Sequence, residues 1–161
     1  MELPYNIINT EKLFCLELNN DISNDYNIIK SQYKYCNVDI LLINRFNLYS
    51  VYIEYKKREY KIGFTSYDSY FIGKVKLIEI DKNYKNCYFI WDFRDSSKSK
   101  EYNDKQFFYI KYNQEFMNKY ELDYDKKNES YRYKILSVDC DLGYDNFIKE
   151  LYIVGNKKIK N

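Results

Sequence analysis

The chain has 161 residues, enough for one ordinary domain with a buried core, and 45% of them are hydrophobic. Its 26 basic and 24 acidic residues leave a net charge of +2, which excludes histone-like generic phosphate binding but allows a local basic cleft. The sequence contains no histidine, which excludes Ser-His-Asp and Cys-His catalysis and restricts any zinc site to cysteine or carboxylate ligands.

The first half of the chain is predicted to begin with a helix and continue into a hairpin. Residues 10–30 favour a helix with Thr10 as its N-cap, interrupted by the Asn/Asp cluster at 19–25. Residues 38–44 and 48–57 are β-rich runs, and the three residues between them suit a tight hairpin connection. Apolar spacing in residues 65–83 predicts an amphipathic helix.

The second half is predicted to contain mainly strands. Residues 86–93 are almost continuously apolar, which is typical of a strand buried on both faces. Residues 96–105 are expected to form a polar loop, residues 106–113 and 130–138 further strands, and residues 146–154 a short helix or a last strand. The ending at 155–161 is expected to be a solvated basic tail. With no repeat and no linker, this order predicts a single α/β domain over residues 1–161, with a mixed sheet.

The cysteine spacing and the first 26 residues indicate the cellular compartment in which the protein is expected. The four cysteines are widely spaced and form no CxxC pair, so a zinc ribbon is not expected. The first 26 residues contain acidic residues and no apolar run, which argues against a secretory signal, and no stretch approaches the length of a membrane span. We therefore expect an intracellular protein with reduced thiols and no membrane partner.

The predicted hairpin carries three charged residues that strand alternation can place on one face. Glu54 and Lys56 are two positions apart and so share a face. If residues 46 and 47 form the turn, antiparallel partners sum to 93 and Asp39 lies opposite Glu54. Their Cβ atoms would then be about 4.5–5.5 Å apart, and two like charges at that separation destabilise a sheet unless they are neutralised.

A divalent cation would neutralise this pair of carboxylates. Mg²⁺ prefers hard oxygen ligands and commonly binds one or two carboxylates together with water and substrate phosphate. Lys56 beside the pair would suit a role in holding a phosphate or activating water, so the pattern predicts a metal-dependent phosphodiesterase. The competing interpretation is an ordinary half-exposed hairpin, and a register shift of one residue would separate Asp39 from Glu54.

The spacing D-x14-E-x-K across a hairpin resembles the PD-(D/E)xK nuclease superfamily, which has the restriction-endonuclease-like fold. The segments "IEYKKREY", "TSYDSYFIGKVKLIEI", "CYFIWDFRD" and "FFYIKYNQEF" are also similar to small replication-repair nucleases of large DNA viruses and phages. The resemblance covers about residues 8–116. In one departure from the family, Asn37 and Val38 precede Asp39 where members often have a proline.

The resemblance implies an αβββαβ core with a mixed central sheet flanked by helices. It also implies Mg²⁺ or Mn²⁺ as cofactor and nucleic acid as substrate, with DNA favoured over RNA, in viral replication, repair or recombination. A homodimer, and a place in the host cytoplasm, the nucleus or the virion, would fit such a protein. The implied roles are metal ligation by Asp39, Glu54, the Tyr55 carbonyl and Glu11 (with Glu17 as the alternative), catalysis by Asp39, Glu54 and Lys56, and phosphate contact by Arg58 and Lys74.

Two other function classes stay open on the sequence alone. A catalytically inactive relative could bind nucleic acid or serve as a virion or structural protein, and some of the 21 tyrosines could then stack on bases or line an interface. A plain interaction protein would have no nucleic-acid partner. A cleavage assay and a binding assay in EDTA distinguish the three.

Overall fold

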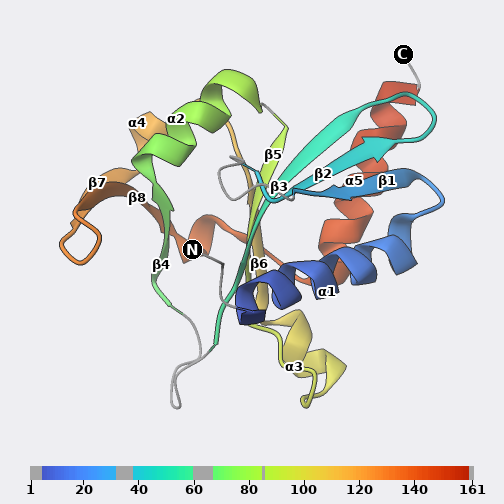
Figure 1. Ribbon diagram of the computed structural model, residues 1–161, viewed down its shortest axis with the longest axis horizontal. Helices are drawn as coiled ribbons and strands as arrows, with labels where there is room; N and C mark the ends of the chain where they lie inside the picture. The colour runs from blue at the N-terminus through green and yellow to red at the C-terminus, as the bar shows by residue number, and fades with distance from the viewer. Residues whose placement is uncertain (1–4, 32–37, 60–66, 85, 160–161) are drawn as a thin grey trace.

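A computed structural model of the chain describes residues 5–31, 38–59, 67–84 and 86–159. Two sheets organise these residues (Figure 1). The larger has six strands in the order β1-β2-β3-β5-β6-β9, in which β3 and β5 are parallel and all other neighbours antiparallel. Its strands are β1 (Tyr26–Lys30), β2 (Ile40–Asn44), β3 (Ser50–Lys57), β5 (Cys87–Asp92), β6 (Phe107–Lys111) and β9 (Asp141–Leu142).

The smaller sheet has three antiparallel strands in the order β4-β8-β7. Its strands are β4 (Ser69–Gly73), β7 (Glu121–Asp125) and β8 (Ser130–Leu136). The helical elements are α1 (Tyr5–Ile22), α2 (Lys74–Asn83), α3 (Lys100–Asp104), α4 (Phe116–Lys119), α5 (Tyr144–Ile159) and the 3₁₀ turn η1 (Ser137–Asp139). No helix among the described residues is long and apolar enough to span a membrane.

The central sheet lies between two hydrophobic clusters. One cluster packs α1 and α5 against the sheet through residues such as Leu18, Ile53 and Phe147. The other packs α2 and the smaller sheet against the opposite face through residues such as Leu77 and Trp91. Figure 1 shows the same division, with α1 and α5 on one side of the central strands and α2, α4 and the smaller sheet on the other. The fold is therefore the expected mixed α/β fold with a central sheet flanked by helices.

The order α1-β1-β2-β3-α2-β5 reproduces the expected αβββαβ sequence of elements, with β4 inserted before α2. All six residues of β5 are buried, as the apolar run predicted, because the strand is covered on both faces. The hairpin prediction is also confirmed, since β2 and β3 are joined by a turn at residues 45–47.

Several local predictions are wrong. The first helix begins at Tyr5, so Thr10 lies inside it, and the second part of the predicted 10–30 helix is strand β1. The predicted helix over 65–83 is helical only from Lys74, because the residues before it form β4. The predicted polar loop at 96–105 contains the short helix α3, which is N-capped by Ser99.

Of the two alternatives for residues 146–154 the helix is confirmed, and the expected tail after it is corrected. Residues 146–154 belong to helix α5, which continues to Ile159, so the expected tail is partly helical. Gly155 in this helix is buried against Tyr26 and Asn44: a Cβ there would lie 2.7 Å from the Tyr26 hydroxyl and 2.9 Å from Asn44 Nδ2. The Tyr26 hydroxyl donates to the Leu151 carbonyl at 2.7 Å, and Asn47 Nδ2 donates to the Gly155 carbonyl at 3.0 Å. Helix α5 therefore packs against β1 and the β2–β3 turn at Leu151 and Gly155.

Candidate active site

The β2–β3 hairpin has the register that brings Asp39 and Glu54 together. The ladder pairs Leu42 with Val51 and ends with Ile40 paired to Ile53, so the partner numbers sum to 93 as predicted. The turn supports this register, because Asn44 and Tyr49 form its closing pair through an N–H···O bond of 2.8 Å. Asp39 and Glu54 are consequently the next opposing positions beyond the ladder.

Asp39 directly precedes β2, and its side chain takes the place of a backbone acceptor for β3. Its backbone N–H donates to the Ile53 carbonyl at 3.0 Å, and its Oδ2 accepts the Tyr55 N–H at 2.8 Å. Burial raises the pKa of Asp39, and the Tyr55 amide and the charges of Lys76 and Lys56 act in the opposite direction. The carboxylate is therefore held against β3 at the position where the two strands separate.

Glu54 is a buried carboxylate with an incomplete set of partners. It is 1% exposed; its Oε2 accepts from Lys76 Nζ at 2.7 Å, while its Oε1 is buried with no hydrogen-bond partner among the described residues. Burial, and next the charge of Asp39, raise the pKa of Glu54 to about 7, although Lys76 acts to lower it. A buried oxygen without a hydrogen-bond partner lowers the stability of the folded state, so stability alone does not explain a glutamate at position 54.

Lys56 lies on the same face of β3 as Glu54, two residues further along. Its Nζ donates to the Phe71 carbonyl of β4 at 3.1 Å. Burial, and next the charge of Arg58, lower the pKa of Lys56 to about 8. An amine with a pKa of about 8 is partly neutral at physiological pH and can then accept a proton, whereas a solvated surface lysine is almost entirely protonated.

Glu11 of α1 lies within electrostatic reach of Asp39. Burial, and next the Asp39 charge, raise the pKa of Glu11 to about 7, and Lys30 lies 3.8 Å from its Oε2. Within residues 5–31, 38–59, 67–84 and 86–159, however, no three acidic, cysteine or histidine side chains converge closely enough to hold a metal by themselves. Glu11 therefore belongs to the surroundings of the Asp39–Glu54 pair and does not form a closed ligand shell with it.

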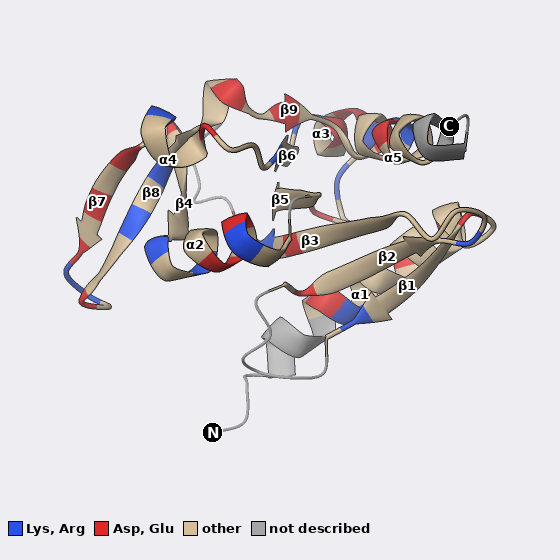
Figure 2. Cartoon of the chain, turned by 90° about the horizontal axis from the view of Figure 1, so that it is seen from above, with Lys and Arg blue, Asp and Glu red and all other residues tan. Residues whose placement is uncertain are grey.

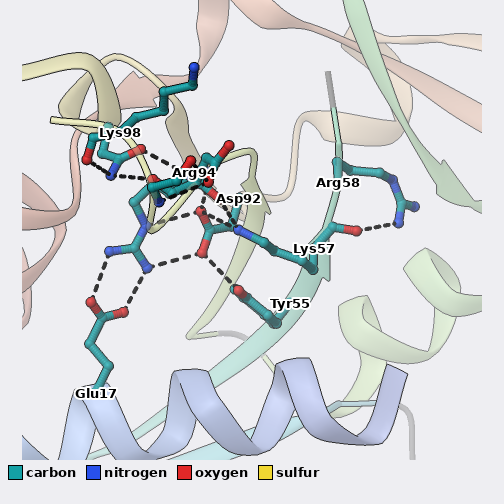
Figure 3. A network of polar contacts seen from close by, with 10 residues as sticks. Glu17, Tyr55, Lys57, Arg58, Asp92, Arg94 and Lys98 are labelled. Carbon is teal, nitrogen blue, oxygen red and sulfur yellow. Dashed lines mark hydrogen bonds and ion pairs between the residues drawn. The ribbon is translucent and has the colours of Figure 1, made fainter. Parts of the chain in front are cut away.

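The opposite face of β3 carries a second charged cluster (Figure 3). Asp92, at the end of β5, accepts hydrogen bonds from the Tyr55 hydroxyl at 2.7 Å and from Arg94 at 3.0 Å. Arg94 also binds both oxygens of Glu17, at 2.9 and 2.6 Å, and stacks over aromatic rings of the adjacent core. Lys57 lies 3.7 Å from Asp92 and donates to the Arg94 carbonyl.

This second cluster decides between the two glutamates that were considered on the first helix. Glu17, named as the alternative to Glu11, is held by Arg94 on the face of β3 that is turned away from Glu54. The structure therefore does not bring Glu17 to the Asp39–Glu54 pair, whereas the pKa of Glu11 responds to Asp39 directly.

The two predicted phosphate contacts, Arg58 and Lys74, come from different parts of the fold. Arg58 is exposed, follows the end of β3, and lines both a cleft of about 1220 Å³ near α1 and a cleft of about 470 Å³ near β4. Lys74 is the first residue of α2, and its Nζ lies 5.8 Å from the centre of the Tyr131 ring. Figure 2 shows that β3 is uncharged along its first half, with charged residues near its C-terminal end.

The sequence interpretation missed Lys76, the residue that pairs with Glu54. It chose Lys74 as the functional lysine of the helix, but Lys76 is four residues before the buried Ile80. Residues at that spacing lie on one helix face, so the spacing could have indicated that Lys76 points toward the sheet.

A divalent cation fits the donor atoms of this site. Asp39 and Glu54 offer carboxylate oxygens from adjacent strands, and the partnerless Glu54 Oε1 is an acceptor that a cation would satisfy. Two carboxylates, completed by water and substrate oxygens, are a common ligand set for Mg²⁺. The residues present therefore suit a hard cation better than zinc, which in structural sites prefers a closed set of cysteine and histidine ligands.

Comparisons with known proteins give a relation at the level of fold. No protein-family model matches the chain, and no curated protein matches it in sequence. Among solved structures, the chain is similar to D212, a nuclease from a fusselovirus, with a TM-score of 0.57 and 18% sequence identity. The similarity covers 99% of this chain and 98% of that one. The chain thus has the fold of a viral nuclease over its whole length.

Proposed function

We propose that the chain is a metal-dependent nuclease of the PD-(D/E)xK type that hydrolyses phosphodiester bonds in nucleic acid, DNA in preference to RNA, during viral replication, repair or recombination. The observation that carries the proposal is the meeting of Asp39, Glu54 and Lys56 at the point where β2 and β3 separate. The similarity in fold to a viral nuclease supports it.

Asp39 and Glu54 would hold Mg²⁺ or Mn²⁺, with the Tyr55 carbonyl as a third ligand and Glu11 as an outer carboxylate. When bound, such a cation would neutralise charge on the scissile phosphate and favour ionisation of an attacking water. Asp39 is positioned for this role by the Tyr55 N–H, and Glu54 by the Lys76 ammonium.

Lys56 would act on the attacking water or on the charge that develops on the phosphate. Its Nζ is held next to the carboxylates by the Phe71 carbonyl, and its lowered pKa permits proton exchange near pH 8. Arg58 and Lys74 would contact phosphates near the cleavage position. Arg58 follows Lys56 by two residues and lines the same cleft, and Lys74 begins α2 directly after Gly73 of that cleft.

A cleavage panel with linear, branched and single-stranded DNA and RNA, in Mg²⁺, Mn²⁺ or EDTA, tests this proposal. We expect the wild-type protein to cut at least one DNA substrate when a metal is present and none in EDTA. Glu54→Gln, which keeps the shape of the side chain but removes its charge, should abolish cutting. Wild-type protein that cuts none of these substrates with either metal would contradict the proposal.

The Lys76–Glu54 ion pair favours one second candidate, a nuclease-like protein that binds nucleic acid without cutting it. Lys76 Nζ lies 2.7 Å from the carboxylate oxygen that a cation would otherwise share. This candidate predicts binding of DNA or RNA in EDTA with a steep salt dependence, and binding that Glu54→Gln leaves intact. Thermal stabilisation by millimolar Mn²⁺ in the wild type but not in Glu54→Gln would argue against it.

A further inference from the structure

The cleft of about 470 Å³ begins at the proposed catalytic lysine. It is lined by Lys56 and Arg58 from the end of β3, by Phe71 and Gly73 of β4, and by Asn128 and Ser130 at the β7–β8 connection. The Lys56 ammonium lies at its edge, because the bond to the Phe71 carbonyl ties it to β4. A volume of this size is within the range of pockets that enclose a small planar ligand.

Flat aromatic rings form much of the wall of this cleft. Behind the wall lies a buried layer in which Tyr70 (5% exposed) is stacked on Trp91 (2% exposed) with ring centroids 4.9 Å apart. Tyr67, whose ring centroid is 5.5 Å from that of buried Phe93, and Phe71 are only partly buried and supply the aromatic surface of the cleft. The Arg132 guanidinium lies 3.7 Å from the centre of the half-buried Phe71 ring, so this wall consists of planar groups. Planar aromatic and guanidinium groups are the surfaces on which nucleobases stack, regardless of base identity.

Polar groups line the cleft at the β7–β8 connection. Asn128 donates to Asp125 Oδ2 at 2.8 Å, and Arg132 is bound by Asp123 and Asp125. The β3 end is lined by Lys56, Arg58 and Glu59, and its two cations are the ones left for a phosphate, while the hairpin end supplies amide and hydroxyl groups beside Asp125. This arrangement matches a nucleotide, whose phosphate and base lie at opposite ends.

We propose that this cleft binds the base of an unpaired nucleotide next to the scissile phosphate, so that the preferred substrate is single-stranded DNA or DNA with an unpaired nucleotide at the cleavage position. The inference rests on the proposed function, because it places the scissile phosphate at Lys56. A base inside a continuous duplex is stacked and paired, and entering the cleft would require it to leave the stack.

Binding in EDTA tests the inference without any cleavage. The probes are a fluorescein-labelled single-stranded oligonucleotide, its duplex, and an oligonucleotide of the same length made of abasic nucleotides, measured by fluorescence anisotropy. We expect the wild type to bind the single strand about tenfold more tightly than the abasic strand, since stacking of one base contributes about that factor, and also more tightly than the duplex.

Gly73→Phe is designed to fill the cleft. A Cβ at Gly73 would meet no atom within 4 Å, and its backbone φ of −56° suits any residue. Ser130→Phe, at an exposed rim position, is a second blocking variant that does not touch the core. Val138→Phe, at a residue that is 85% exposed and outside the cleft, is the matched control.

Both blocking variants should lose the preference for the single strand over the abasic strand, and Val138→Phe should keep it. A wild type that binds the two strands equally, or that binds neither, would overturn the inference, as would blocking variants that are folded and keep the preference. If the protein shows the predicted preference for the single strand but cuts nothing, the base site is supported and the nuclease proposal is contradicted. If it cuts DNA and binds single and abasic strands equally, the nuclease proposal is supported and the base site is contradicted.

Discussion

The two faces of β3 carry charges in alternation, and they differ in how completely those charges are satisfied. On the face toward α1, Asp92 receives hydrogen bonds from Tyr55 and Arg94, and Arg94 is in turn bound by Glu17. On the face toward α2, Glu54 keeps one buried oxygen without a partner among the described residues. Similar residue types therefore form a closed network on one face and an open one on the other.

The pKa directions repeat this contrast. Burial alone would raise the pKa of Asp92, yet the hydrogen bonds and charge of Arg94 hold it below its usual value. Burial also acts on Glu54, and there its pKa is raised to about 7 despite the Lys76 partner. A closed network stabilises the charged form, whereas an open one leaves charge that a ligand could neutralise. A buried polar atom without a hydrogen-bond partner is thus a better indicator of a functional site than the number of charged residues nearby.

Replacing either of two adjacent lysines, Lys56 or Lys57, which lie on opposite faces of β3, should give the largest difference in cleavage rate. Lys56→Ala should lower the rate of metal-dependent cleavage by about 10²–10⁴-fold, the usual contribution of a positioned proton-transfer group. Lys57→Ala, on the Asp92 face, is the matched control and should keep the rate within about threefold. Single-turnover kinetics on the substrate identified by the cleavage panel measure both. Equal losses in the two variants would remove the functional contrast.

Opening the closed network should affect stability instead. Arg94→Ala leaves Asp92 and Glu17 without their main partner, and breaking such a buried pair costs about 3 kcal/mol in the free energy of unfolding. Arg45→Ala, which removes an exposed arginine bonded to the Ser23 carbonyl, should cost less than about 1 kcal/mol. Urea denaturation at pH 7 tests the pair, and an Arg94→Ala protein as stable as wild type would show that the network is dispensable.

The open face should make the metal-free protein less stable as pH rises. The folded pKa of Glu54 is raised to about 7 from 4.5, so between these values the folded state binds more protons than the unfolded state and stability falls with pH. We expect a loss of about 2 kcal/mol between pH 5 and pH 8, attenuated in Glu54→Gln. Asp92, with a lowered pKa, stays ionised over this range and adds no slope.

Urea denaturation in EDTA at pH 5, 6, 7 and 8 measures this slope. Adding Mn²⁺ should restore stability most at pH 8, because ligation requires deprotonated carboxylates. A wild type whose unfolding free energy rises steadily from pH 5 to pH 8 would contradict the assignment of an open carboxylate pair.

The smallest expected effect comes from a single hydroxyl in the closed network. Tyr55→Phe removes the 2.7 Å bond to Asp92 but leaves the Arg94 and Lys57 partners, so it should cost about 1 kcal/mol in unfolding free energy. It should not alter cleavage, since the Tyr55 N–H and carbonyl remain. Tyr124→Phe at an exposed position is the control for loss of a hydroxyl, and thermal unfolding compares the two.

The hairpin and the buried strand could be predicted because strand alternation and a continuous apolar run are local patterns. The register that opposes Asp39 and Glu54 follows from the turn position, which the residue types at 45–47 indicate. Strands β1 and β4 could not be found in this way. Each is five residues long and flanks a helix, so its apolar residues were assigned to the helical period.

The closed network on the other face of β3 was also beyond the reach of sequence patterns. Glu17, Asp92 and Arg94 come from α1, from the end of β5 and from the loop after it, and only the packing of α1 over the sheet brings them together. Helix spacing could indicate which way Lys76 points, but not its pairing with Glu54, which lies 22 residues earlier in the chain. Long-range pairing of this kind requires the fold to be known first.

The close approach at Gly155 has a practical consequence for dividing the chain into fragments. The sequence pattern from which the site was predicted ends near residue 116, which would suggest that a shorter protein could contain everything the site needs. Yet the hairpin turn is bonded to the Gly155 carbonyl, and Tyr26 beside it to Leu151. A glycine inside a helix costs about 1 kcal/mol relative to alanine, and here it allows α5 to pack directly on β1 and β2. The smallest fragment that keeps the hairpin supported must therefore extend through Gly155.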